Sequence, residues 1–357
     1  MSPSSVVSVL PAGKGAAMSG RRIVIHTSMM VRMRLALATA LFLGACGGAG
    51  GGAKAGGAAA LPRLVAAPLL EGETVVLDGA TGDPVWTRAR EILLPLSGPG
   101  PDRVHLKAAY DDERIYLFAI WPDPEVTTGR YYEFTSDRKW IAHDDEDGFG
   151  VCWSPAAEAA RFREQGCALY CHDDNHRYLA DEGAVDFWSW RAQQTRPHNQ
   201  ARDMWLPAGR NQRLRGDGQP EESDNYPNLR EKVFAPKYVP FRVSVDSRRF
   251  LWPSNINELP TDWTSKLDPE QNIGWQVAMD ILRPMKGSRG DIEASARHVR
   301  GSWILELARA RATGHRDDEP LVDLRLPHLF AVAIHEGGAG PKRHSTSGPV
   351  ELVFESR

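Results

Sequence analysis

The sequence reads VHLKAAY at residues 104–110, DDE at residues 111–113 and RIYLFAIW at residues 114–121. Two runs of apolar and aromatic residues that flank a short polar turn are typical of a β-hairpin. This stretch therefore predicts two strands, paired through a tight turn, in a β-rich domain.

Similar runs recur near the C-terminus, at residues 302–307 (SWILEL), 329–334 (LFAVAI) and 349–354 (PVELVF). Many short strands separated by turn signals indicate an all-β sandwich. We expect this domain to occupy residues 64–357.

The alternation is lost between about residues 154 and 265, where Pro, Asp, Arg and Trp are frequent and only residues 156–165 have a helical pattern. We expect a long irregular insertion here, because long loops without periodicity are usually functional or disordered. Its many tryptophans favour an ordered segment.

This insertion contains the motif Cys167-Ala168-Leu169-Tyr170-Cys171-His172. The common c-type haem attachment signature is C-x-x-C-H, and this motif has one more residue between the thiols. Cys167 and Cys171 would bond to the haem and His172 would be an axial iron ligand. The alternative is a local disulfide, since cysteines four apart in a helical turn lie about 6 Å from each other.

The N-terminal region predicts export and lipidation. Residues 30–34 are basic in character, residues 35–43 are apolar but too short to span a bilayer, and Leu43-Gly44-Ala45-Cys46 follows. This ending is similar to a bacterial lipobox, in which Cys46 becomes the lipidated first residue. We expect residues 1–45 to be a signal region, of which residues 1–29 are a misassigned start, and an ordinary signal peptide is the alternative.

A tether and an acidic domain follow the predicted anchor. Residues 46–63 are mostly Gly and Ala, and such a coil reaches roughly 20 Å on average. Removal of residues 1–45 leaves 38 basic and 46 acidic residues, a net charge of −8, which argues against a nucleic-acid partner. We expect a bacterial envelope protein on the periplasmic side, an outer-membrane lipoprotein held by its lipid anchor, with Cys152 buried as a small apolar residue.

Several further segments form a pattern with the hairpin and the cysteine motif. They are Leu77-Asp78-Gly79 with Asp83-Pro84-Val85-Trp86, Trp121-Pro122-Asp123, Asp145-Glu146-Asp147 with Val151-Cys152-Trp153, Asp186-Phe187-Trp188-Ser189-Trp190-Arg191, Gly287-Ser288-Arg289-Gly290-Asp291, and Trp303 to Arg309. Over about residues 73–356, this pattern resembles the cytochrome c-552 / DMSO reductase-like haem-binding domain, which includes the gamma subunit of ethylbenzene dehydrogenase.

The resemblance implies an immunoglobulin-like β-sandwich that carries one haem and transfers electrons outside the cytoplasm. In the gamma subunits, methionine and lysine hold a non-covalent haem b. The cysteines and His172 of this chain depart from that arrangement, so the resemblance points to its c-type branch, and the b-type ligand pair cannot be carried over.

A sixth iron ligand and groups for the haem propionates remain to be assigned. The resemblance puts the far ligand in the loop before the last strand, where His344 is the first candidate; the alternatives are Met204, His198 and His335. Arg191, Arg196 and Arg202 follow the motif, and arginine binds carboxylates bidentately.

The residues support three functions. The first is a lipid-anchored monohaem c-type cytochrome, an electron carrier and not an enzyme, which serves a redox partner protein. The second is a haem-bearing subunit of a molybdenum oxidoreductase. The third is a haem-free carbohydrate- or ligand-binding module in which Cys167 and Cys171 form a disulfide.

Overall fold

Most of the chain from residue 60 onward is described in the computed structural model. The described residues are 60–154, 159–166, 184–207, 224–230, 234–240, 246–247, 250–315, 318–337 and 344–356. The predicted signal region, Cys46, Cys167, Cys171 and His172 lie outside these residues.

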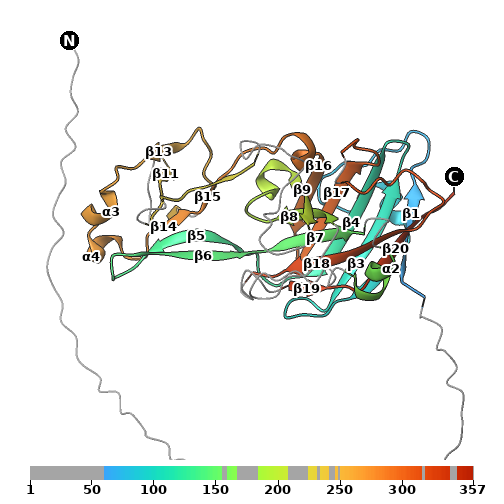
Figure 1. Cartoon of the computed structure of the whole chain (residues 1–357), viewed down its shortest axis with the longest axis horizontal. Helices are drawn as coiled ribbons and strands as arrows, with labels where there is room; N and C mark the ends of the chain where they lie inside the picture. Colours follow the sequence, from blue (N-terminus) through green and yellow to red (C-terminus); the bar gives the residue numbers. More distant parts are fainter. Residues whose placement is uncertain are drawn as a thin grey trace, which may run out of the picture. The chain divides into compact units, whose positions relative to one another are not determined.

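The described residues form a main sheet of 12 strands that closes on itself (Figure 1). Closure follows because β1 pairs in parallel with β20 and also with β3. The strands are β1 (Arg63–Pro68), β2 (Ile92–Pro95), β3 (Arg103–Tyr110), β4 (Arg114–Pro122), β7 (Gly148–Trp153), β8 (Ala184–Arg191), β9 (Gln200–Pro207), β16 (Ile292–His298), β17 (Ser302–Ala310), β18 (His328–His335), β19 (His344–Thr346) and β20 (Val350–Phe354).

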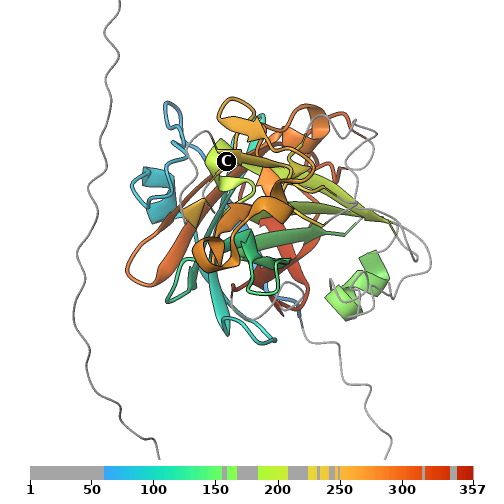
Figure 2. The same ribbon diagram turned by 90° about the vertical axis from the view of Figure 1, so that its left-hand side faces the viewer.

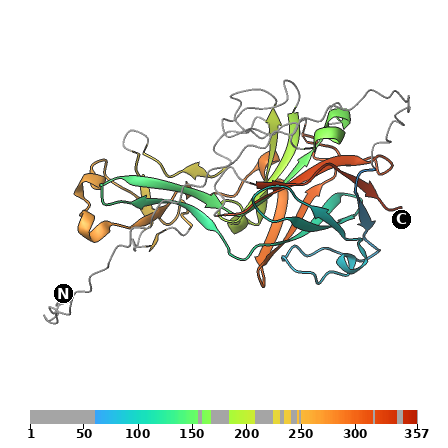
Figure 3. The same cartoon turned by 90° about the horizontal axis from the view of Figure 1, so that it is seen from below.

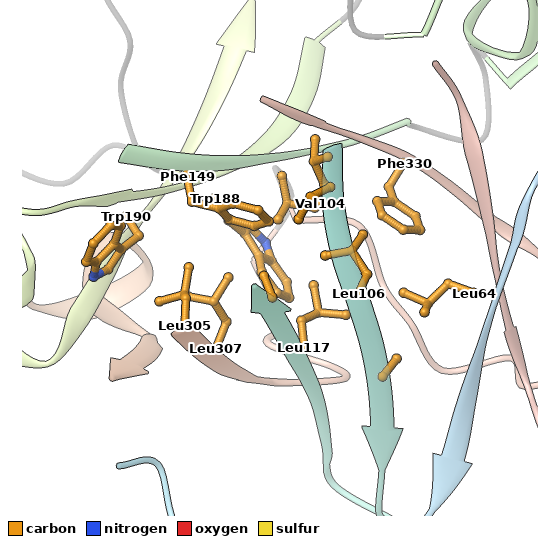
Figure 4. Close-up of a cluster of buried hydrophobic side chains, with 14 of the residues drawn as sticks. Leu64, Val104, Leu106, Leu117, Phe149, Trp188, Trp190, Leu305, Leu307 and Phe330 are labelled. Carbon is orange, nitrogen blue, oxygen red and sulfur yellow. The ribbon is translucent and has the colours of Figure 1, made fainter. Parts of the chain in front are cut away.

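Alternate residues of these strands fill one core inside the closed sheet. On β8, Trp188 and Trp190 point inward, and on β4, Leu117 and Trp121 do the same. Figure 4 shows Trp188 beside Leu117 within this cluster. The predicted all-β sandwich is therefore confirmed, with a core rich in tryptophan.

The predicted hairpin is β3 and β4, whose register begins at Tyr110 opposite Ile115. Asp111 holds the turn, because its Oδ1 accepts hydrogen bonds from the backbone N–H groups of Glu113 at 2.8 Å and Arg114 at 2.7 Å. An aspartate that binds the backbone two residues on is a common turn device.

The irregular segment is shorter than the sequence pattern indicated. Strands β8 and β9 come from the range 154–265, yet they lie in the main sheet between β7 and β16. Their alternation is concealed because Asp186 and Asp203 point inward, where both carboxylates bind the buried Arg309. A polar residue at an inward position breaks the apolar pattern from which a strand is recognised.

A two-stranded ribbon extends from the main sheet toward a smaller group of elements (Figures 1 and 3). The ribbon is β5 (Thr128–Phe134) and β6 (Trp140–Glu146), which pair antiparallel. A second core covers it, built around Phe134, Trp140 and Trp263. The other elements of this part are β10 (Tyr226–Pro227), β11 (Tyr238–Pro240), β12 (Asp246–Ser247), β13 (Ile256–Glu258), α3 (Trp263–Lys266), α4 (Pro269–Asn272), β14 (Gln276–Ala278) and β15 (Asp280–Ile281). At the far end of the ribbon, β14 pairs with β5 and β12 pairs with β14, so the four strands form a small sheet.

The helices of the described residues are short: α1 (Pro84–Arg88), α2 (Ala159–Gln165, Figure 2), and the 3-10 turns η3 (Arg196–His198) and η6 (Gly287–Gly290). Helix α2 falls within the predicted helical segment, and its Phe162 packs on the outer face of the main sheet against Cys152 and Leu329. Cys152 is buried, as predicted. No helix among the described residues has the length and apolar character to cross a membrane.

Candidate functional site

The outer face of the main sheet carries a cavity of about 390 Å³ at the point where the ribbon leaves it. We call it the sheet-face cavity. Strands β8, β9 and β18 supply one side, and the ribbon supplies the other. Its lining comprises Arg130, Asp144, Glu146, Ser189, Arg191, Gln194, Arg202, Met204, Asp224, Arg289, His335 and Glu336.

A glycine between two strands brings a guanidinium and an imidazole together. Gly148 of β7 lies opposite Arg191 of β8 and also opposite His335 of β18. A Cβ atom at Gly148 would lie 2.8 Å from Cδ of Arg191. Because this atom is absent, Arg191 reaches across β7, and its Nη2 lies 3.2 Å from Nε2 of His335.

Most of the cationic groups of the cavity are paired with acids. Arg130 binds Asp280 at 2.7 Å and also contacts Asp144. Asp224 binds Arg202 at 3.0 Å and Arg289 at 2.6 Å. In these ion pairs the carboxylates neutralise Arg130, Arg202 and Arg289. The three arginines therefore form part of the cavity wall and offer little positive charge to a ligand.

Arg191 is the exception. Among the described residues, no carboxylate forms a salt bridge with its guanidinium, and His335 is its side-chain hydrogen-bond partner. Burial lowers the pKa of Arg191, and the negative charge of Glu146 offsets part of this effect. Burial likewise raises the pKa of Glu146, although Arg130 and Arg191 oppose the shift. A part-buried cation that forms no direct ion pair favours an anionic ligand.

The candidates for the sixth ligand lie in different surroundings. Met204 is buried and lines the cavity together with His335. His344 pairs with His335 across β19 and β18, and the two ring centroids are 4.9 Å apart. His198 lies elsewhere, edge-on to Trp252 at 4.8 Å.

The three predicted propionate arginines do not form one cluster. Arg191 and Arg202 line the sheet-face cavity, but the η3 turn between β8 and β9 carries Arg196 into a second cavity, which Phe250 also lines. Arg196 therefore lines a different cavity from Arg191 and Arg202.

Sequence reasoning missed several groups in the cavity wall: Arg130, Glu146, Asp224 and Arg289. They come from the ribbon, from the segment after β9 and from η6. Glu146 and Arg289 lie in segments that carry the family resemblance, but nothing in those segments assigned them to a binding site, and no local pattern marks Arg130 or Asp224. In contrast, Arg202 and Met204 are two apart on β9, a spacing that puts both on one strand face.

The residues of the sheet-face cavity fit a haem group by their chemistry. The cavity is lined by one thioether, Met204, and one imidazole, His335, with His344 across the strand pair from His335, and both group types are usual protein ligands of haem iron. A guanidinium such as that of Arg191 binds a carboxylate. Gly148 and Gly150 carry no side chains, and Arg191 and Phe187 pack over them. Gly150 is required here, because a Cβ atom would lie 2.7 Å from the ring of Phe187.

Comparison with known proteins gives one family. The sequence pattern of the family described as ethylbenzene dehydrogenase matches residues 84–347. Among curated proteins, none matches the chain significantly. Two structures of a family 9 carbohydrate-binding module from Caldicellulosiruptor kristjanssonii, in complex with cellotriose and with glucose, are each 9% identical and have TM-scores of 0.34. They cover 82% of this chain, and 95% and 97% of their own chains.

Proposed function

Because this chain belongs to the ethylbenzene dehydrogenase family, we propose that it is a haem-bearing electron-transfer protein whose haem occupies the sheet-face cavity. The observation that carries the proposal is the position of Arg191. Its part-buried guanidinium forms no salt bridge among the described residues and lies beside His335, in a cavity that Met204 also lines. Haem supplies one-electron transfer at its iron.

Arg191 holds one haem propionate in this proposal. The carboxylate provides the anion that the part-buried guanidinium lacks, and the contact is a charge-assisted hydrogen bond. Arg202 is already paired with Asp224 at 3.0 Å, so its role is to fix the cavity wall and not to bind the propionate directly.

Cys167 and Cys171 would hold the haem covalently in this proposal, and His172 would bind its iron. The motif begins directly after Gly166, which follows α2. Helix α2 packs through Phe162 on the outer face of the sheet that also carries the cavity, against Cys152 of β7. Gly166, the last described residue before the motif, therefore follows a helix that packs on the side of the sheet where the haem is proposed.

His344 is our candidate for the sixth ligand. Nε2 of His335 is engaged by Arg191, and His344 lies directly across from it on the same face. In this arrangement His335 lies between Arg191 and His344, and its role is to position these two side chains. Two histidine ligands leave no open iron position, which suits an electron carrier.

The proposal extends to the whole protein. Cys46 is lipidated, the mature chain lies in the envelope on the periplasmic side, and a redox partner protein receives or delivers the electron. The family favours a second candidate, in which the chain is the haem-bearing subunit of a molybdenum oxidoreductase. Copurification with a large catalytic subunit distinguishes this candidate from a free cytochrome.

The attachment is tested with the full chain exported from a bacterium that has the cytochrome c maturation machinery. The double variant Cys167→Ser/Cys171→Ser should lose covalent haem, whereas Cys152→Ala, the matched cysteine control, should keep it. Equal haem attachment in both variants would contradict the assignment.

The iron ligand is tested by absorption spectra. His344→Ala should let the ferrous protein bind CO and should shift the reduction potential. Met204→Ala should leave the low-spin spectrum in place. If Met204→Ala removes that spectrum and His344→Ala changes nothing, the ligand is Met204. If neither substitution changes the spectrum, the variants His335→Ala and His198→Ala test the remaining candidates.

A further inference from the structure

The ribbon separates two cavities because its side chains alternate between its faces. Arg130 and Asp144 form one cross-strand pair and line the sheet-face cavity. The neighbouring pair, Tyr131 and His143, lines a second cavity of about 630 Å³. Successive residues of a strand point to opposite faces, so the two cavities lie on opposite sides of the ribbon. We call the second one the ribbon cavity.

Arg196 is the cationic group of the ribbon cavity. It forms no salt bridge or side-chain hydrogen bond among the described residues, and its guanidinium lies 5.4 Å from the ring centroid of Trp303. This distance is within the range of a cation–π contact. Burial lowers the pKa of Arg196, and Asp147 opposes the shift. The guanidinium is therefore positioned by an aromatic ring and keeps its donors available.

Asp147, the buried acid whose charge acts on Arg196, is already occupied. Asp147 accepts hydrogen bonds from the backbone N–H groups of Thr127 at 2.7 Å and Gly337 at 2.9 Å. It also accepts one from the indole Nε1 of Trp303 at 3.1 Å. Its carboxylate thus serves the backbone and Trp303, and it does not neutralise Arg196 by direct contact.

The remaining lining is flat and partly apolar. The rings of Tyr131 and His143 stack with centroids 4.4 Å apart and planes 16° apart. Phe250 and Val126 add apolar surface, and Asp145 adds one acidic group. Asp145 disfavours a ligand with a second negative charge.

We propose that the ribbon cavity binds a small organic monocarboxylate with a flat apolar body, and that Arg196 holds its carboxylate. A guanidinium fork matches a carboxylate bidentately, and aromatic walls suit a planar ligand. Pockets of this volume commonly hold small molecules through apolar walls and a few polar groups.

This site is independent of the haem proposal. The side chain of Gln193 accepts a hydrogen bond from the backbone N–H of Arg130 at 2.8 Å and donates one to its carbonyl at 2.9 Å. Gln193 lines the ribbon cavity, whereas Arg130 lines the sheet-face cavity. This clamp stands between the two cavities, so a ligand in one does not occupy the other.

Benzoate is the probe, with neutral benzamide as its isostere, and the full exported chain is titrated by calorimetry or ligand-observed NMR. We expect saturable benzoate binding to the wild type and at least about tenfold weaker benzamide binding, a factor equal to 1.4 kcal/mol. Arg196→Gln should weaken benzoate binding by a similar factor. Arg103→Gln, a control at an exposed arginine with 51% of its side chain accessible, should leave binding unchanged.

Phe250→Ala is a second variant that leaves the charge intact, and it should also weaken benzoate binding. Haem content and spectrum should be unchanged in Arg196→Gln, which separates this test from that of the haem site. The proposal is overturned if benzoate does not bind the wild type or if Arg196→Gln binds it as well as the wild type does. It is also overturned if Arg191→Gln, and not Arg196→Gln, abolishes binding.

Discussion

Nη2 of Arg191 lies 3.2 Å from Nε2 of His335, although 144 positions separate the two residues in the chain. They meet across β7 because Gly148 stands between them without a side chain. Strands β8 and β18 therefore present a cation and an imidazole to one cavity. The proposed haem site depends on this juxtaposition.

The substitution Gly148→Ala should disturb this pair without unfolding the protein. The added Cβ would lie 2.8 Å from Cδ and 2.9 Å from Nη1 of Arg191, and a flexible side chain can move away. We expect a stability loss of about 1–3 kcal/mol, toward the lower end if Arg191 moves away, together with a shifted reduction potential. Gly348→Ala, which meets no atom within 4 Å, should shift neither quantity. Identical potentials in both variants would count against the role of Arg191.

The substitution Arg191→Leu should affect the haem-free and haem-loaded proteins differently. The haem-free protein loses a part-buried cation that forms no salt bridge among the described residues, so its free energy of unfolding should change by no more than about 1 kcal/mol. Haem retention should fall, because the propionate loses its partner. Chemical denaturation and haem titration measure the two effects. A large stability loss in the haem-free variant would show that Arg191 serves the fold.

The substitution Arg309→Met should destabilise the main sheet strongly. Nη1 of Arg309 lies 2.8 Å from Asp186 and 3.0 Å from Asp203, and the three side chains are almost fully buried. Removal of the cation leaves buried acids uncompensated, so we expect a loss of about 3–5 kcal/mol. Arg325→Met, which breaks an exposed pair with Asp323, is the control and should not move the denaturation midpoint. Equal midpoints in the two variants would contradict this account.

The buried acids should make the protein less stable as the pH rises from acid to neutral. Burial raises the pKa of Asp123, Asp186 and Asp291 to about 6 each. The folded protein then holds these protons more tightly than the unfolded chain, whose aspartates titrate near pH ~3.9. The stability contributed by the protonated acids is complete below that pH and is lost as the pH rises through the folded values.

Asp123→Asn isolates one of these acids. The variant should match the wild type near pH 4 and exceed it near pH 7.5, because the amide cannot ionise in its buried position. Denaturation midpoints at several pH values measure the difference. A constant difference across this range would show that Asp123 does not titrate as argued.

The fold could be read from local signals where those signals were apolar. The β3–β4 hairpin follows from two apolar runs and from Asp111, all within one short stretch. Strand β8 could not be read in the same way, because Asp186 points into the core toward an arginine 123 residues away. A partner at that distance leaves no trace in a local pattern.

Only part of the candidate site could be predicted from the sequence, for the same reason. Arg191 and Arg202 were predicted together and line one cavity. Arg196 lies near both in sequence, yet the η3 turn directs it to the other side of the ribbon. Arg130 carries no local signal, and the segment that contains Arg289 matched the family pattern without marking it as a site residue, since only the folded chain brings the ribbon and η6 to the sheet face.

The haem content of the exported wild-type chain tests the central claim most directly. The protein is denatured and extracted with acidified acetone, and the pyridine haemochrome spectrum is then compared with the protein concentration. We predict one haem per chain that stays with the polypeptide and shows the spectrum of a c-type haem. A haem-free protein whose mass is lower by two hydrogens, as for a disulfide between Cys167 and Cys171, would contradict the account.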